Sequence, residues 1–188
     1  MAGSKSLVSR MLRAAKLDSN LYEEVEAEPK AINQALLVVI IVSVLGGIGT
    51  GISGVMAGQG GLAFLWGLLA SIASSLVGWL AWAFFTWLIG TKLLKGPQTS
   101  ATWTEMLRTI GFAYSPGVLR FFVFIPFIGG VIAFAGLIWS LIAGVIAVRQ
   151  ALDFSTGRAI ATCILGWLIY LVISFLVGLL LFGVGSIF

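Results

Sequence analysis

Residues 31–91 read AINQALLVVIIVSVLGGIGTGISGVMAGQGGLAFLWGLLASIASSLVGWLAWAFFTWLIGT and contain no ionisable side chain. A transmembrane helix needs only about 20 apolar residues, so this stretch is longer than one span. Helices and closed barrels alone satisfy every backbone hydrogen bond in lipid. Barrel strands would alternate apolar and polar residues, which this stretch does not do. The sequence therefore predicts an all-α, polytopic integral membrane helix bundle.

The composition agrees with this fold class and excludes several kinds of chemistry. The chain is 60% hydrophobic and 10% charged, with a mean hydropathy of +1.10. It has no histidine, which removes imidazole metal ligands and Ser-His-Asp catalysis. Its one cysteine, Cys163, lies in an apolar block, where packing is its expected role. No carboxylate lies in an apolar block, so proton- or sodium-coupled transport lacks its usual ligand. The sequence shows no paired carboxylates, metal-ligand cluster, phosphate-binding loop or intramembrane nucleophile system, so we predict no enzyme activity and no catalytic, cofactor or metal site.

The apolar blocks predict five transmembrane helices, at residues 32–56, 62–93, 109–127, 129–148 and 159–182. The third block is weak because it contains Pro116, Arg120 and Pro126. It is either a short span or a broken, re-entrant helix. The chain thus divides into an arm, residues 1–30, and a transmembrane domain, residues 31–188.

The arm has two parts. Residues 4–17 place one set of apolar side chains on one helical face and most basic side chains on the other. The apolar set is Leu7, Val8, Met11, Leu12 and Ala15, and the basic set is Lys5, Arg10, Arg13 and Lys16. This spacing indicates a helix in the headgroup layer of an anionic leaflet, or a solvated basic tail. An acidic run with Glu23, Glu24, Glu26 and Glu28 follows.

Charge asymmetry predicts the orientation. With five spans, ten of the eleven basic side chains lie on one side and Arg120 lies on the other. The positive-inside rule then places the N-terminus in the cytoplasm and the C-terminus outside. A re-entrant third block would change the ratio to nine against two and is less favoured.

Small residues recur at helical spacing in the predicted spans. Gly47, Gly51, Gly54 and Gly58 share one face of the first span, and Gly136 and Gly144 share one face of the fourth. Small residues let helix backbones approach closely in lipid, so these faces are predicted to be packing seams. A pore lining is the alternative.

Charged residues near the membrane are the candidate binding sites. Arg120 lies within an apolar block, where an arginine costs roughly 2.5–3.5 kcal/mol at the centre of the bilayer. It either binds a phosphate or a partner's carboxylate, or extends to the headgroups. Arg149 and Asp153 would pair on a continuing helix. With Arg158 they form either a cytoplasmic latch or headgroup site, or ordinary loop charges.

Two short motifs resemble those of the Yip family, the Ypt/Rab-interacting membrane proteins, in its shorter prokaryotic form. Asn20-Leu21-Tyr22-Glu23-Glu24 keeps the Leu-Tyr core of the family's first motif, and Gly111-Phe112-Ala113-Tyr114-Ser115-Pro116 is similar to its second. Ile125-Pro126 and the loop ending Ser155-Thr156-Gly157-Arg158-Ala159 also look like prokaryotic members. The resemblance implies five spans, a cytoplasmic N-terminus and the prokaryotic cytoplasmic membrane, and it makes Tyr22 and Tyr114 candidate interaction residues.

The expected function is non-enzymatic membrane organisation or scaffolding of partner proteins. The alternatives are an accessory subunit of a larger membrane complex, and passive translocation of lipids or small solutes. The expected partners are membrane lipids and other membrane proteins, or a second copy in an oligomer. The family resemblance alone adds small GTPases, which eukaryotic Yip proteins bind, to the expected partners. The sequence contains no nucleic-acid-binding module, so no nucleic-acid partner is expected.

Overall fold

The structure is a computed structural model that describes residues 6–185. Within this range the chain is helical and contains no strand. The elements are α1 (Leu7–Ala15), α2 (Ser19–Ala27), α3 (Ala31–Met56), α4 (Gly61–Leu88), the π-helical turn η1 (Ile89–Leu93), α5 (Trp103–Ala113), the 3-10 helix η2 (Ser115–Phe124), α6 (Gly129–Ala151) and α7 (Thr156–Gly185). Lys5, part of the predicted basic face, lies outside the described residues.

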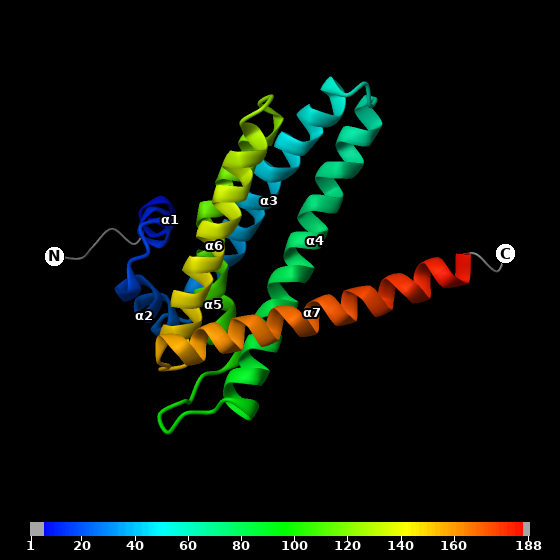
Figure 1. Cartoon of the computed structure of the whole chain (residues 1–188). Coiled ribbons are helices and arrows are strands. Elements are labelled where there is room, and N and C mark those ends of the chain that lie inside the picture. The colour runs from blue at the N-terminus through cyan, green and yellow to red at the C-terminus, as the bar shows by residue number, and fades with distance from the viewer. Residues whose placement is uncertain (1–5, 186–188) are drawn as a thin grey trace.

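Four helices among the described residues are long and apolar enough to cross a membrane. They are Ala31–Met56, Gly61–Leu93, Gly129–Ala151 and Thr156–Ile173. In Figure 1, α3, α4 and α6 run alongside one another, whereas α7 crosses them and leads away from the bundle. The all-helical membrane fold is confirmed, and these helices coincide closely with the first, second, fourth and fifth predicted spans.

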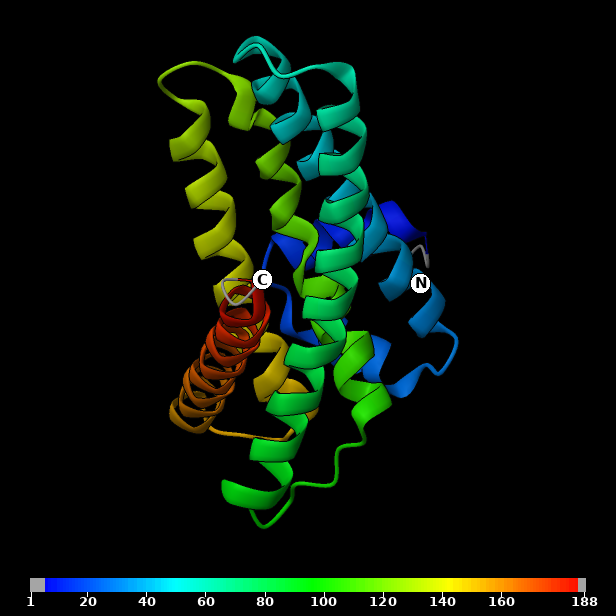
Figure 2. The ribbon, with the colours of Figure 1, turned by 90° about the vertical axis from the view of Figure 1, so that its right-hand side faces the viewer.

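The third predicted span, residues 109–127, does not form one helix. α5 ends at Ala113, and η2 begins at Ser115 with Pro116 in its first turn. Proline disfavours the α conformation of the residue before it, which explains the break at Ser115. The ten residues of η2 extend about 20 Å at about 2.0 Å per residue, less than the roughly 30 Å hydrocarbon core. Figure 2 shows α5 and η2 following one another along the bundle. The break in the third block, one of its two predicted forms, is therefore confirmed, and its crossing of the membrane stays a prediction.

The α3–α4 hairpin closes through a turn at Gly58. Gly58 has a φ of 83°, its N–H donates to Val55 O, and the Gln59 N–H donates to Gly54 O at 2.9 Å. These bonds satisfy the last carbonyls of α3 and define a Schellman ending, which favours glycine because of its left-handed conformation. A Cβ at Gly58 would contact nothing within 4 Å. The prediction that Gly58 packs against another helix is therefore wrong.

Other glycines of α3 do lie against α4 or the hairpin turn. A Cβ at Gly47 would lie 2.8 Å from Leu68 Cδ1, and one at Gly51 would lie 2.2 Å from the Phe64 ring. Gly54 faces the Gln59 side chain in the hairpin. The Ser71 hydroxyl of α4 also donates to the Ser43 carbonyl of α3 at 3.0 Å. The two backbones therefore approach closely along this seam.

The two glycines of α6 that were predicted to pack, Gly136 and Gly144, contact two different neighbouring helices. A Cβ at Gly136 would lie 2.8 Å from Leu119 Cβ on η2. A Cβ at Gly144 would lie 2.6 Å from the Trp82 ring on α4. On the other side of η2, Gly49 of α3 lies against the Phe121 carbonyl. The 3-10 helix is therefore held between α3 and α6.

Candidate functional site

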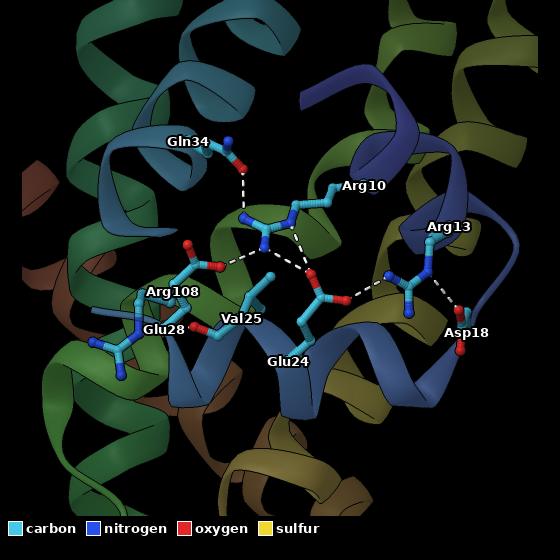
Figure 3. Close-up of polar contacts among 8 residues, drawn as sticks. All are labelled: Arg10, Arg13, Asp18, Glu24, Val25, Glu28, Gln34 and Arg108. Atoms are coloured by element: carbon cyan, nitrogen blue, oxygen red, sulfur yellow. Dashed lines mark hydrogen bonds and ion pairs between the residues drawn. The ribbon is translucent and has the colours of Figure 1, made fainter. Parts of the chain in front are cut away.

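The N-terminal arm folds back onto one end of the bundle, where α1 and α2 form a cap (residues 6–28). Arg10 on α1 joins this cap to the first long helix and is only 1% exposed. Its Nη1 donates to Gln34 Oε1 on α3 at 2.7 Å, and its Nη2 donates to Glu24 Oε1 at 2.7 Å and Glu28 Oε2 at 2.5 Å. Figure 3 shows the guanidinium surrounded by these three side chains. We call this cluster, Arg10, Glu24, Glu28 and Gln34, the cap junction.

Within the cap junction one cation, Arg10, faces two carboxylates, and Arg13 pairs with Glu24 at the edge of the cluster. Burial lowers the pKa of Arg10, but its hydrogen bonds to Glu28 and Glu24 outweigh burial and raise that pKa above its usual value. The hydrogen bond from Arg13, opposed by burial and aided by Arg10, lowers the pKa of Glu24. Hydrogen bonds to charged groups contribute about 1.5–3 kcal/mol to stability, and here the cation is buried while its carboxylate partners are partly exposed. Arg10 therefore fixes α1 and α2 against α3.

The position of Arg10 corrects the predicted amphipathic helix. α1 is a folded helix, but Arg10 points inward whereas Val8 and Leu12 are 66% and 57% exposed. Leu7 and Met11 of the predicted apolar face do pack against the core, so the helical wheel misplaced only part of each face. It misplaced Arg10 because it could not include the acidic partners that α2 supplies. Arg13, in contrast, lies at the half-buried edge, with Nε 2.7 Å from Asp18 Oδ2 and Nη1 2.6 Å from Glu24 Oε2.

Arg108 on α5 provides a second attachment for the cap. Its Nε donates to the Val25 carbonyl at 3.0 Å, and its Nη2 donates to the Glu26 carbonyl. Both carbonyls belong to the last turn of α2, where the helix itself supplies no partner. A cation there also interacts favourably with the negative end of the helix dipole. Arg108 therefore caps α2 and binds it to α5.

Glu26 occupies the junction between the cap and the rest of the bundle. Burial, followed by the charges of Glu105 and Asp153, raises the pKa of Glu26 to about 7, although Arg108 opposes this shift. The neighbouring Glu23 also raises it and accepts a 2.6 Å hydrogen bond from Gln150 Nε2 on α6. With a pKa of about 7, the Glu26 carboxyl changes its charge near neutral pH.

Tyr22 does not face a partner in this structure. Leu21 and Tyr22, which resemble the core of the family's first motif, lie on α2 and are both fully buried. Burial, and then the charge of Asp18, raises the pKa of Tyr22, and its hydroxyl has no hydrogen-bond partner among the described residues. In the docked arm Tyr22 packs in the core, and its role as an interaction residue stays a prediction.

The three predicted loop charges do not form one site. α6 ends at Ala151, and Asp153 has a left-handed φ of 51°, so Arg149 and Asp153 do not share a helical face. Arg149 Nε instead donates to Gln150 Oε1 at 3.0 Å. The Arg158 guanidinium lies next to Gly96, where an added Cβ would be 2.7 Å from Nη1. The predicted Arg149–Asp153 helical pair is therefore wrong because the helix stops too early.

Arg120 and Tyr114 lie together in a different part of the molecule. Both line a cavity of about 490 Å³ bordered by α4, α6, α7 and η2. Arg120 has no ion pair with any described residue, and its guanidinium lies against Gly46 of α3. The structure thus separates Arg120 from the other predicted charged residues.

Sequence reasoning missed the cap junction and Arg108. One available signal was Gln34, a polar residue in the first turn of an otherwise apolar helix. Another was the pair Glu24 and Glu28, which are four residues apart and so share one side of a helix. Neither signal identifies Arg10 as their partner, because that contact depends on how the arm folds back.

The long apolar helices and the docked cap define a polytopic helical membrane protein. The sequence profile of the Yip1 domain matches residues 19–186, and the chain belongs to this family. The match begins at α2 and so includes part of the cap as well as the long helices. No curated protein and no solved structure matches the chain.

Proposed function

We propose that this Yip-family protein is a non-enzymatic scaffold that organises the membrane and holds partner proteins at its surface. The observation that carries this proposal is the cap junction, which makes the arm a fixed surface. A preorganised surface loses less conformational entropy on binding than a flexible tail. A scaffold benefits from this property, because its partners then bind to a surface that is already ordered.

The cap offers two different outward surfaces. α1 contacts η2 as well as α2, which places it beside the transmembrane part of the chain. We propose that the exposed Val8 and Leu12 lie in the headgroup layer, as amphipathic helices do. α2 exposes Asn20 and Glu23 instead, and we assign this polar surface to partner proteins.

The proposed topology has five crossings, with α5 and η2 together forming the third. The cap, Lys30, Lys92, Lys95 and the α6–α7 loop then share the cytoplasmic side, and the α3–α4 hairpin lies outside. The positive-inside rule supports this orientation. A crossing made of two helices is acceptable because α3 and α6 enclose η2, so its backbone is shielded from lipid.

Affinity purification in a mild detergent tests the scaffold proposal. We expect specific membrane proteins to be recovered with the tagged full-length chain and not with an unrelated membrane protein carrying the same tag. Recovery of the chain alone, combined with no effect on lipid order in reconstituted vesicles, would contradict the proposal. Small GTPases of the same cell are a defined class to score in this experiment.

A further inference from the structure

The cavity beside Arg120 has the size and composition of a ligand site. Its volume of about 490 Å³ lies within the roughly 300–1,000 Å³ range of ligand pockets. Figure 2 faces this side of the molecule, with α6 and α4 on either side of η2 and α7 projecting toward the viewer. The exposed apolar side chains at its edge include Leu141, Ile164 and Trp167. Because the segments of α4, α6 and α7 that border it belong to candidate membrane spans, we expect the cavity to open toward the hydrocarbon of the bilayer.

One wall of the cavity carries an indole whose hydrogen bond is missing. Three tryptophans lie on successive turns of α4. Trp79 Nε1 donates to the Leu107 carbonyl at 3.0 Å and Trp87 Nε1 to the Ala101 carbonyl at 3.1 Å. Trp82 lines the cavity, and its buried Nε1 has no partner among the described residues. A buried donor without a partner costs about 1–3 kcal/mol, so an acceptor in the cavity would stabilise it.

A hydroxyl in the opposite wall is also unpaired. Ser43, Thr86 and Ser115 each donate to a carbonyl of the preceding turn, at 2.9, 2.7 and 2.7 Å. Ser140 on α6 makes no such bond among the described residues, although its Oγ is buried. A Cβ at Gly117 would lie 3.6 Å from this oxygen, which places Ser140 next to η2.

Arg120 supplies the charge at one end of this row of donors. Gly117 and Arg120 are three residues apart and therefore share one face of a 3-10 helix. Gly136, Ser140 and Gly144 are four residues apart on α6 and so share one side of the helix, with a rise of about 6 Å between them. Leu119, next to Arg120, lies against Gly136, and Trp82 lies against Gly144. The order along the cavity is thus a cation, a hydroxyl and an indole N–H.

We infer that this cavity binds one anionic phospholipid from the surrounding bilayer. The phosphate oxygens accept hydrogen bonds from the Arg120 guanidinium, a charge-assisted contact for which arginine is well suited. The ester carbonyls lie one or two helical turns further along and accept from Ser140 and Trp82. An acyl chain fills the apolar remainder. No Asp or Glu lines the cavity, so its charge complements an anionic head.

The spacing of the donors favours a phospholipid over other anions. A fatty acid carries its acceptors at one end and would leave the more distant indole unpaired. Free phosphate would leave the apolar part of the cavity unfilled. This inference does not rest on the scaffold proposal, because a lipid site requires no partner protein.

Native mass spectrometry of the full-length chain in mild detergent tests the inference. The delipidated protein is titrated with dioleoyl phosphatidylglycerol, and separately with dioleoyl phosphatidylcholine, oleate and inorganic phosphate. We expect one phosphatidylglycerol per chain, bound about tenfold or more tightly than the other three probes. Arg120→Gln should weaken phosphatidylglycerol by about tenfold, because it removes the charge-assisted contact. Arg149→Gln, outside the cavity, should leave binding unchanged.

A second pair of variants tests the cavity without touching the charge. Gly78 lines the cavity, and a Cβ there would contact nothing within 4 Å, so Gly78→Leu fills the space while retaining Arg120. It should weaken phosphatidylglycerol binding several-fold, whereas Gly67→Leu on the same helix but outside this cavity should not. Helix content and melting temperature show that the variants fold. Equal binding of all four probes, or unchanged binding in both Arg120→Gln and Gly78→Leu, would overturn the inference.

Discussion

Arg10 and Gln34 join the N-terminal arm to the first long helix through a hydrogen bond of 2.7 Å between Nη1 and Oε1. The same guanidinium binds Glu24 and Glu28 on α2, so one side chain connects α1, α2 and α3. Movement of α3 relative to the cap would break bonds to a buried charge. The cap and the start of the first span therefore behave as one unit.

Loss of Arg10 should destabilise the protein more than loss of its neighbour. Arg10→Met removes a buried cation and its hydrogen bonds to Glu24 and Glu28, whose side chains are 36% and 28% exposed, and we expect it to lower the free energy of unfolding by about 1.5–3 kcal/mol. Arg13→Met, the matched control on the same helix, removes ion pairs at the half-exposed edge and should cost only about 1 kcal/mol. Thermal unfolding in detergent measures both. Equal melting temperatures for the two variants would contradict the assigned role of Arg10.

Arg108 should stabilise the end of α2 more than the rest of the cap. Arg108→Leu leaves the Val25 and Glu26 carbonyls without a donor, at a cost of about 1–3 kcal/mol each when such groups stay buried. Hydrogen exchange should therefore accelerate at residues 21–28 and remain close to wild type in α6. Unchanged exchange in α2 would show that Arg108 is not its cap.

Stability should depend on pH through Glu26. Its pKa is raised to about 7 in the folded protein, so the folded state holds a proton that the unfolded state has already released. Stability is then greatest below the unfolded pKa and falls as the pH rises toward about 7. Glu26→Gln should remove this part of the decline between pH 5 and pH 7.5. Melting temperatures across that range measure it, and an equally steep decline in the variant would refute the assignment.

The seam between α6 and η2 should tolerate no side chain larger than glycine. Gly136→Val would bring a Cβ to 2.8 Å from Leu119 Cβ and 3.2 Å from the Pro116 carbonyl, and we expect a loss of about 1–3 kcal/mol. Gly67→Val, where an added Cβ meets nothing within 4 Å, is the control. Unfolding in detergent compares them. A stable Gly136→Val variant would mean that η2 does not pack as described.

Labelling of single cysteines should establish the topology. In a Cys163→Ser background, Lys16→Cys is expected to react with an impermeant thiol reagent only after the cells are opened. Gln59→Cys, at the hairpin on the opposite end of the bundle, should react in intact cells. The reverse pattern would invert the proposed orientation.

The long helices could be predicted from sequence because a continuous apolar block of about 20 residues or more indicates a membrane-spanning helix without reference to the rest of the chain. The break in the third block was visible for a local reason as well, since Pro116 disfavours a continuous helix. Gly58 shows the limit of spacing arguments: it continues the glycine pattern of α3, but it lies one residue beyond the helix cap and serves the turn. Its role depends on where the helix ends.

The cap junction could not be predicted in the same way. A helical wheel places Arg10 with the exposed basic residues, because it contains no information about α2 or Gln34. The cavity could not be predicted from sequence either, because Trp82, Arg120 and Ser140 come from three different elements. Their missing hydrogen bonds and ion pairs become visible only when those elements are placed together.

We propose that the docked cap is the surface through which this protein holds its partners. The most direct test compares the membrane proteins recovered with wild type, Arg10→Met and Arg13→Met after gentle crosslinking and mild solubilisation, at equal amounts of folded protein. The account predicts that Arg10→Met loses most of the recovered partners while Arg13→Met retains them. Full recovery with Arg10→Met, together with protease cleavage showing that its cap is undocked, would contradict it.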